Sequence, residues 1–325
     1  MKAIASDRYG SADRLSLRDV PAPSIGDDDV LVEVRAAAVD PGVWIFMTGR
    51  PLAARLASGL RSPRNPVLGR ALAGVVAAVG ARVTRMRPGD HVYGTGESGT
   101  FAEFARARER RLARMPANLT FEQAAAVPIS AVTALQALKD ARVRANQRVL
   151  VIGAGGGVGT FAVQLANHQE AQVTGVCGPS KVQLVRSLGA VDVVDYTQRE
   201  IDSTGVRYDA IIDTAGNRPL ALLHRAITPD GTIALVGGGH ATGPVLGGFG
   251  RQMAAPLISV FRRARLVGVT AGEHHTDLDE LTTLLESGAI TPVVGRTYPL
   301  AETADAIRHI EEGHPTGKVV ITVRG

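Results

Sequence analysis

The chain has 325 residues, a net charge of +5, 45% hydrophobic residues and 4% aromatic residues, which is the composition of an ordinary soluble globular protein. Its arginine-rich runs at 106–114 and 262–265 are not interleaved with stacking aromatic side chains, so we expect no nucleic-acid partner. No apolar run approaches the length of a membrane span, no signal-peptide pattern is visible, and a single cysteine precludes an internal disulfide, so we expect a cytoplasmic protein without a membrane partner.

The first third of the chain is rich in strand patterns. Residues 30–35 alternate with a period of two, as in a half-buried strand, and the small apolar run 73–80 predicts a second strand. The turn pattern Pro88-Gly89-Asp90 leads into a further strand at 91–94. Residues 45–66 mix Leu, Arg, Pro and Gly, which indicates a long surface loop or a short helix beside a cleft.

From about residue 118 the pattern changes to helices, and then to strands that alternate with helices. Thr120 and Gln123 form a capping-box pattern ahead of a helical stretch, Ala125–Leu138. Strands are predicted at 149–152, 172–177, 191–195, 208–213, 231–236 and 265–269. Helices are predicted between them at 159–168, 181–188 and 219–228. This alternation is typical of a parallel sheet covered on both faces.

Two more helical segments, 277–287 and 301–311, precede a final apolar strand that ends at Val323. That strand needs a sheet partner, and the β-rich N-terminal part is its expected host. We therefore predict a discontinuous β-rich domain, 1–122 and 272–325, into which an α/β domain, 123–271, is inserted.

Residues 148–166 hold the most informative motif, a strand followed by a glycine-rich turn and a helix. Glycine lets the backbone turn sharply and approach a phosphate, and the helix N-terminus offers unpaired N–H groups to the negative charge. The register is G-x-x-G-x-x-G, with Ala154 where the common fingerprint G-x-G-x-x-G has its first glycine. We interpret the turn as a dinucleotide pyrophosphate site, the alternative being a purely structural turn. The residues assigned to it are Gly153, Gly156, Gly157, Val158 and Gly159.

The next strand, 172–177, indicates which dinucleotide is bound. It ends about 20 residues after the glycine turn, where an acidic residue would hold the ribose 2′-hydroxyl of NAD. Cys177 stands there, Ser180 and Lys181 follow, and Tyr196 follows one strand later. A 2′-phosphate gains from such donors, because each charge-assisted hydrogen bond is worth about 1.5–3 kcal/mol. We predict NADPH rather than NADH, the alternative being that Lys181 is solvated and Tyr196 only a capping aromatic.

Motifs along nearly the whole chain resemble the medium-chain dehydrogenase/reductase superfamily, specifically its zinc-independent quinone oxidoreductase branch. They are the glycine turn, Asp28–Val34, Pro66–Gly69, Arg87–Val92, Ala124–Pro128, Ser187–Ala190, Val194–Tyr196, Leu235–Gly238 and Gly317–Val320. The resemblance implies an α/β fold made of a GroES-like β-rich catalytic domain and a Rossmann domain with a doubly wound parallel sheet. It also implies a homodimer.

Against this family the chain lacks the zinc ligands. Zinc-dependent members place a Cys near position 40 and a His-Glu pair where this chain has Asp40 and Arg70-Ala71. Their structural zinc needs four closely spaced cysteines, whereas this chain has only Cys177. The one suggestive cluster is Glu273-His274-His275, which we interpret as a solvated loop. We expect a protein without zinc.

The resemblance also assigns further cofactor contacts by position. It places Thr133 near the nicotinamide, the backbone of Val236 and Gly237 at the carboxamide, and Lys318 close to the cofactor phosphates. The alternatives are a helix hydroxyl bonded to its own backbone, a strand-end turn and an exposed cation.

The substrate contacts depart from the family pattern, and no catalytic group is identified. Asp40 stands where the family commonly has Asn. It either forms a compensating ion pair with Arg70 or, where burial raises its pKa, donates a proton. Trp44 and Tyr93 either line an apolar pocket together with Phe46 or are ordinary core or cleft-wall aromatics. The pocket candidates are Asp40, Trp44, Arg70 and Tyr93.

The absence of metal ligands favours a particular class of acceptor. A simple carbonyl needs a Lewis acid, whereas a quinone or an α,β-unsaturated carbonyl spreads the arriving charge over its own π-system. The sequence therefore predicts an NADPH-dependent, zinc-independent oxidoreductase that reduces a small quinone or an activated alkene or carbonyl. The alternatives are an enoyl-thioester reductase of a biosynthetic pathway and a non-catalytic NADPH-binding sensor or interaction protein.

Overall fold

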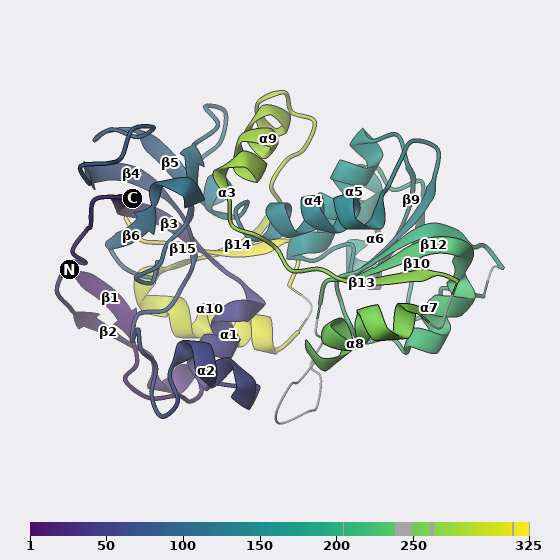
Figure 1. The fold of residues 1–325 in the computed structure, drawn as a ribbon, viewed down its shortest axis with the longest axis horizontal. Helices are drawn as coiled ribbons and strands as arrows, with labels where there is room; N and C mark the ends of the chain where they lie inside the picture. Colours follow the sequence, from purple (N-terminus) through teal and green to yellow (C-terminus); the bar gives the residue numbers. More distant parts are fainter. Residues whose placement is uncertain (204, 238–248, 261–262, 314, 325) are drawn as a thin grey trace. The chain divides into compact units, whose positions relative to one another are not determined.

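The computed structural model describes residues 1–203, 205–237, 249–260, 263–313 and 315–324. The chain forms two compact units (Figure 1). We call Met1–Val132 with Glu273–Gly325 the β-rich unit, and Thr133–Gly272 the parallel-sheet unit. Gly238 and Arg262, which belong to motifs noted above, lie outside the described residues.

The parallel-sheet unit is built on six strands in the order β10-β9-β8-β11-β12-β13. They are β8 (Arg148–Ile152), β9 (Gln172–Cys177), β10 (Asp192–Asp195), β11 (Tyr208–Asp213), β12 (Ile227–Leu235) and β13 (Arg265–Gly268). Each neighbouring pair is parallel. The strand order reverses between β8 and β11, and doubly wound sheets bind their ligands at the carboxyl ends of the strands at such a point.

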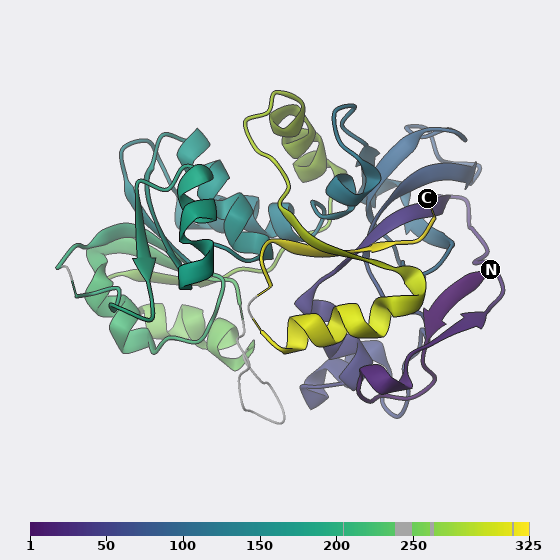
Figure 2. The ribbon, with the colours of Figure 1, turned by 180° about the vertical axis from the view of Figure 1, so that it is seen from behind.

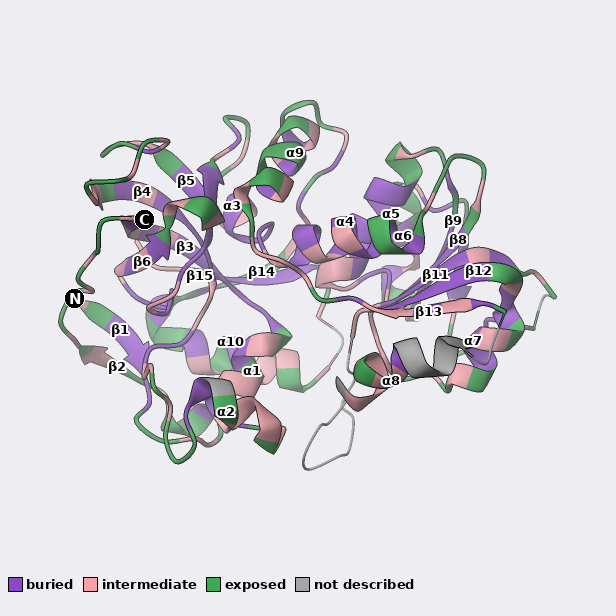
Figure 3. Cartoon of the chain, viewed as in Figure 1, coloured by how far each residue is buried: buried purple, intermediate pink, exposed green. Residues whose placement is uncertain are grey.

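Helices cover both faces of this sheet. α4 (Ser130–Ala141), α5 (Gly157–His168) and α6 (Val182–Ser187) lie on one face, and α7 (Leu220–Ala226) and α8 (Phe249–Val260) lie on the other (Figure 1). Because both faces are covered, the strands are continuous apolar runs. The four residues Val149–Ile152 of β8, for example, are each 0% exposed (Figure 3). The six predicted strands and the three helices between them are confirmed, and the largest difference is that β12 begins at Ile227 rather than at residue 231.

The β-rich unit contains a seven-stranded sheet in the order β14-β15-β3-β4-β5-β7, with β6 also paired to β3. Its strands are β3 (Asp29–Val39), β4 (Ala71–Val79), β5 (His91–Thr95), β6 (Phe104–Arg108), β7 (Leu112–Arg114), β14 (Val294–Pro299) and β15 (Lys318–Thr322). β1 (Lys2–Ala5) and β2 (Ser16–Asp19) form a separate antiparallel pair. β15 pairs antiparallel with β3, Val319 opposite Val39, which confirms that the final strand joins the N-terminal part (Figure 2).

The helices of the β-rich unit are α1 (Pro41–Thr48), α2 (Arg55–Ser58), α3 (Phe121–Ala125), α9 (His275–Glu286) and α10 (Thr303–Glu311). Residues 45–66 therefore contain the end of α1, a 3₁₀ turn and α2 in addition to loop. α10 packs against β14 and β15. In the described part of the chain, no helix combines the length and the apolar character needed to cross a bilayer.

The helical stretch predicted at Ala125–Leu138 is interrupted. The capping box is confirmed, with Gln123 N donating to Thr120 Oγ1 at 3.3 Å and Thr120 N donating to Gln123 Oε1 at 3.0 Å. α3 nevertheless ends at Ala125 and α4 begins at Ser130. Pro128 lies between them and lacks the N–H that a continuous helix requires.

The first break between the units falls between Val132 and Thr133, rather than between residues 122 and 123. The reason is that α3 packs against β3 and β4, so this helix is part of the β-rich unit. The second break lies between Gly272 and Glu273, one residue beyond the predicted break at 271/272.

Candidate functional site

The glycine turn lies between β8 and α5, and its glycines are required for different reasons. Gly153 has a φ of +81°, a conformation that favours glycine. A Cβ atom at Gly159 would lie 2.1 Å from the carbonyl oxygen of Gly153, so α5 can approach the turn this closely only without a side chain. Gly156 is the N-cap of α5 and leaves the helix end open, with no side-chain cap. The first turn of α5, which includes Gly157 and Val158, offers its N–H groups to an anion.

Lys181 packs over this turn. A Cβ atom at Gly155 would lie 2.6 Å from Lys181 Cδ and 2.9 Å from its Cβ, so the stem of the lysine rests directly on the glycine backbone. Lys181 is only 9% exposed, and this burial lowers the pKa of its ammonium group. The structure therefore brings Lys181 and the glycine turn together. Gly155, which is not among the glycines assigned from the sequence, makes this close contact possible.

Tyr196 and Ser180 lie at the same edge of the sheet. Tyr196 follows β10, and its N–H donates to the carbonyl of Cys177 at the end of β9, at 3.2 Å. A Cβ atom at Gly178 would lie 3.1 Å from the Tyr196 hydroxyl, so this hydroxyl faces the turn after β9. Tyr196 is 38% exposed and Ser180 is exposed. The three residues predicted to bind a 2′-phosphate are thus grouped around one turn.

The turns after β8, β11 and β12 are held in contact with one another. Thr214 Oγ1 donates to the carbonyl of Ile152 at 2.7 Å. The N–H groups of Val236 and Gly237 donate to the carbonyl of Asp213 at 3.0 and 3.1 Å. A Cβ atom at Gly237 would lie 2.1 Å from the Thr214 carbonyl oxygen, so a glycine is needed there. The carboxyl edge of the sheet is therefore a compact backbone surface, with Val236 and Gly237 at its β12 end.

Thr133 lies in the first turn of α4. That it lies close to the nicotinamide stays a prediction. Thr133 is half-buried and belongs to the parallel-sheet unit. The assignment of Val236 and Gly237 to the carboxamide also stays a prediction.

Asp40 pairs with Lys318 and not with Arg70. Lys318 Nζ forms an ion pair with Asp40 Oδ1 and donates to the carbonyl of Val39 at 3.3 Å. Asp40 is 5% exposed and Lys318 3% exposed. Ser130 Oγ lies 3.5 Å from Asp40 Oδ1, while Asp40 Oδ2 is buried without a hydrogen-bond partner in the described structure. The structure thus corrects the predicted Asp40–Arg70 pair and buries the ammonium of Lys318. That Asp40 donates a proton, and that Lys318 approaches the cofactor phosphates, stay predictions.

Arg70 is bound by Glu273 instead. Arg70 Nη2 lies 2.5 Å from Glu273 Oε1, and Arg70 Cζ lies 6.0 Å from the centre of the Phe46 ring. Glu273 Oε2 also accepts from Thr95 Oγ1 at 3.0 Å and pairs with Arg111 Nη1 at 3.2 Å. Glu273 lies in a loop, as predicted, and His274 beside it is exposed, but the Glu273 side chain is half-buried and bound to Arg70, Thr95 and Arg111 rather than solvated.

The two aromatic pocket candidates have different environments. Trp44 on α1 is 39% exposed, so its side chain is accessible to a ligand. Tyr93 on β5 is 0% exposed, and its hydroxyl donates to the carbonyl of Leu278 on α9 at 2.8 Å and contacts Thr282 Oγ1 at 2.8 Å. Burial raises the pKa of the Tyr93 phenol. Tyr93 is therefore a core residue that ties β5 to α9, which is the second of the two alternatives given for it above.

We expect Tyr93→Phe to lower the free energy of unfolding by about 0.5–1.5 kcal/mol, the usual net worth of one hydrogen bond. The cost stays moderate because Thr282 Oγ1 also donates to the Leu278 carbonyl, at 2.9 Å, and keeps it satisfied. Urea denaturation measures the change. Tyr196→Phe, at a 38% exposed site, is the control and should stay within about 0.5 kcal/mol of the unchanged protein. A loss above about 3 kcal/mol for Tyr93→Phe would contradict this description.

The donor set at the positions of the family's catalytic zinc does not fit that ion. Asp40 is neutralised by Lys318, and Arg70 brings a cation where a His ligand would be needed. Among the described residues, no group of three or more His, Cys, Asp or Glu side chains could hold a metal ion. His275, at the start of α9, pairs with Asp279 at 2.9 Å.

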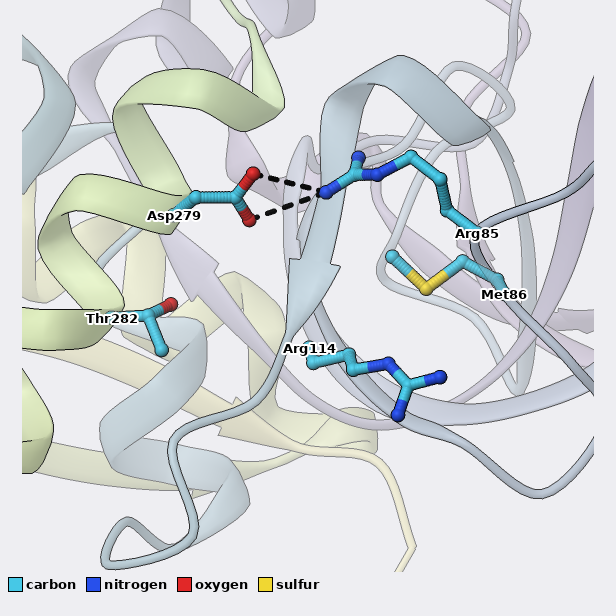
Figure 4. Close-up of a pocket in the computed structure, with 5 residues that line it drawn as sticks. All are labelled: Arg85, Met86, Arg114, Asp279 and Thr282. Atoms are coloured by element: carbon cyan, nitrogen blue, oxygen red, sulfur yellow. Dashed lines mark hydrogen bonds and ion pairs between the residues drawn. The ribbon is translucent and has the colours of Figure 1, made fainter.

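The β-rich unit has a pocket of about 410 Å³ whose lining includes none of the pocket candidates, although Tyr93 contacts one lining residue, Thr282 (Figure 4). Its lining residues are Arg85, Met86, Arg114, Asp279 and Thr282. Arg85 Nη2 contacts both oxygens of Asp279, at 3.0 and 3.3 Å, so the cation is already paired. Figure 4 shows Arg114 directed away from this pair, and its Nη2 lies 3.3 Å from Asp90 Oδ2. The hollow therefore presents paired charges and none of the predicted site residues.

Comparisons with known proteins agree with this architecture. An alcohol dehydrogenase GroES-like domain model matches residues 26–117, and a zinc-binding dehydrogenase model matches residues 188–321. The 2-methylene-furan-3-one reductase of Solanum lycopersicum is 32% identical, and the chloroplastic NADPH-dependent alkenal/one oxidoreductase of Arabidopsis thaliana is 33% identical; each alignment covers 99% of this chain and 79% of the relative. The structure of the quinone oxidoreductase from Coxiella burnetii has a TM-score of 0.86 at 27% identity, covering 100% of this chain and 99% of that chain.

A GroES-like unit combined with a Rossmann sheet defines an oxidoreductase that uses a nicotinamide cofactor. The chain belongs to the medium-chain dehydrogenase/reductase superfamily and, within it, to the quinone oxidoreductase-like branch.

Proposed function

We propose that the chain is an NADPH-dependent, zinc-independent reductase of quinones or of activated alkenes and carbonyls. One observation carries the proposal: a complete glycine turn lies beside Lys181 in a chain whose side chains at positions 40 and 70 are bound in ion pairs rather than arranged around a metal. Its relatives include reductases named for enone substrates, 2-methylene-furan-3-one and alkenal/one.

The residues around the glycine turn fit the phosphates of NADPH. The open N-terminus of α5 would hold the pyrophosphate, and Lys181, Ser180 and Tyr196 would hold the 2′-phosphate with an ammonium and two hydroxyl groups. The bound nicotinamide supplies the hydride. The chain contributes position, by fixing the backbone edge at Val236 and Gly237.

We expect Lys181→Met to weaken NADPH binding roughly 10- to 100-fold, because about 1.5–3 kcal/mol is lost with one charge-assisted contact. Binding of NADH, which has no 2′-phosphate, should change little. Fluorescence titration with both cofactors measures the two affinities. Arg186→Met removes an exposed cation from α6 and serves as the control, with both affinities unchanged. An equal loss for NADPH and NADH would show that Lys181 supports the turn rather than selecting the cofactor.

Steady-state oxidation of NADPH with a panel of quinones, enones and a crotonyl thioester tests the acceptor. We expect turnover with a quinone or an enone, because such acceptors delocalise the arriving charge without a metal ion. Turnover confined to the thioester would favour an enoyl-thioester reductase. Tight NADPH binding without turnover of any acceptor would favour a sensor. The homodimer and the cytoplasmic location stay predictions, and sedimentation velocity tests the first of them.

A further inference from the structure

Two consecutive side chains of α8 hold the ends of β11 and β12. Arg251 Nη2 donates to Asp213 Oδ2 at 3.1 Å, and Arg251 Nη1 donates to the carbonyl of Gly216 at 3.0 Å. Gln252 Nε2 donates to the carbonyl of Val236 at 2.7 Å. The helix is therefore hydrogen-bonded to the residues that follow both strands.

Asp213 is the centre of this arrangement. It is the last residue of β11 and is 0% exposed. Its Oδ1 accepts from the N–H of Gly216 at 2.9 Å, and its carbonyl accepts from the N–H groups of Val236 and Gly237 at 3.0 and 3.1 Å. One residue thus fixes the turn after β11 and the turn after β12, and Arg251 connects both turns to α8.

The helix has little freedom to move relative to the sheet at this point. A Cβ atom at Gly268 on β13 would lie 2.6 Å from the carbonyl oxygen of Gln252 and 3.2 Å from its Cα, so the backbone of α8 rests directly on the strand. The Nε atom of Arg251 is buried and has no hydrogen-bond partner in the described structure. The guanidinium is consequently oriented by its two Nη contacts, to Asp213 and to Gly216.

We propose that Arg251 is a positioning residue for the nicotinamide half of the cofactor. Through Asp213 it sets the Val236–Gly237 turn, and this inference rests on the proposed function, which assigns that turn to the carboxamide. The adenosine half is assigned to the glycine turn and Lys181, which are held together by their own contact. A change at Arg251 should therefore act on one half of the cofactor and leave the other half unaffected.

Arg251→Lys tests this separation. Lysine keeps the charge but lacks the planar fork that reaches two acceptors at once. We expect at least a tenfold loss of affinity for NADPH, a smaller enhancement of the fluorescence of bound NADPH, and an affinity for adenosine 2′,5′-bisphosphate within twofold of the unchanged protein. Arg263→Lys, at an exposed position just before β13, is the matched control and should change none of these. Equal losses for both ligands, or no loss for either, would overturn the inference.

A second variant covers the case in which Arg251→Lys does not fold. In Asp213→Asn/Arg251→Gln both buried charges are gone, so no uncompensated charge is left in the core, while the shorter glutamine cannot reach residue 213 and Gly216 together. We expect this double variant to unfold cooperatively, to lose at least tenfold in NADPH affinity and to keep its affinity for adenosine 2′,5′-bisphosphate within twofold of the unchanged protein. Unchanged NADPH affinity in the folded double variant would overturn the inference. If it does not fold either, the pair maintains the fold as a whole, and the inference is wrong. An unchanged protein that binds neither ligand would instead overturn the proposed function itself.

Discussion

Replacing Gly159 with alanine should abolish measurable NADPH binding and lower the free energy of unfolding by about 1–3 kcal/mol, the usual cost of overpacking. The added Cβ would lie 2.1 Å from the Gly153 carbonyl oxygen and 2.8 Å from the Ala154 Cα. Both atoms belong to the backbone of the turn, so relief requires the turn to move away from α5. Urea denaturation and NADPH titration measure the two effects.

Gly156→Ala distinguishes an effect on NADPH binding from an effect on stability. Its Cβ would lie 3.4 Å from the Gly153 carbonyl oxygen, an ordinary contact, and its φ of −92° and ψ of −179° suit alanine. We expect unchanged stability but weaker NADPH binding, because the methyl group occupies the open end of α5. Gly42→Ala in α1, with no atom within 4 Å of the new Cβ, should be neutral or stabilise by up to about 1 kcal/mol. Unchanged stability in Gly159→Ala would show that α5 does not pack against the turn this closely.

Much of the parallel-sheet unit could be predicted from the sequence, because its information is local. A strand buried on both faces is a short apolar run, and β8 and β9 stand out for that reason. The glycine turn is equally local, since a positive φ at Gly153 and the missing space at Gly159 both demand glycine. Asp213 was missed as a site residue, although an acidic residue at the end of an apolar strand is a visible signal. Its partner Arg251 follows it by 38 positions, and no pattern connects the two.

The candidate site in the β-rich unit could not be predicted in the same way, because it depends on the pairing register of distant strands. Lys318 lies beside Asp40, 278 positions earlier, only because Val319 on β15 pairs with Val39 on β3. The sequence predicts both strands but not their register. Tyr93 shows the same limit. The side chains of β5 alternate between the two faces of the sheet, and the sequence does not show that α9 covers the face on which Tyr93 lies.

In the β-rich unit, the largest stability effect is expected for Lys318→Met, about 3–5 kcal/mol of destabilisation. Removing one member of a buried ion pair leaves the other as an uncompensated charge. Asp40 would keep only the contact from Ser130 at 3.5 Å, and its Oδ2 already lacks a partner among the described residues. Lys139→Met, the same substitution at an exposed position of α4, should stay within about 0.5 kcal/mol. Urea denaturation of both variants provides the comparison.

The double variant Asp40→Asn/Lys318→Met decides what Lys318 is for. It removes both charges, and we expect it to recover most of the stability lost in Lys318→Met, which gives a coupling energy in a double-mutant cycle. If the buried pair is the whole role of Lys318, this stable variant binds NADPH as tightly as the unchanged protein. If Lys318 instead contacts the cofactor phosphates, as the family resemblance implies, the variant stays folded but loses roughly tenfold or more in NADPH affinity, the loss of one charge-assisted contact. Because the structure buries the ammonium against Asp40 and Val39, we expect the first result.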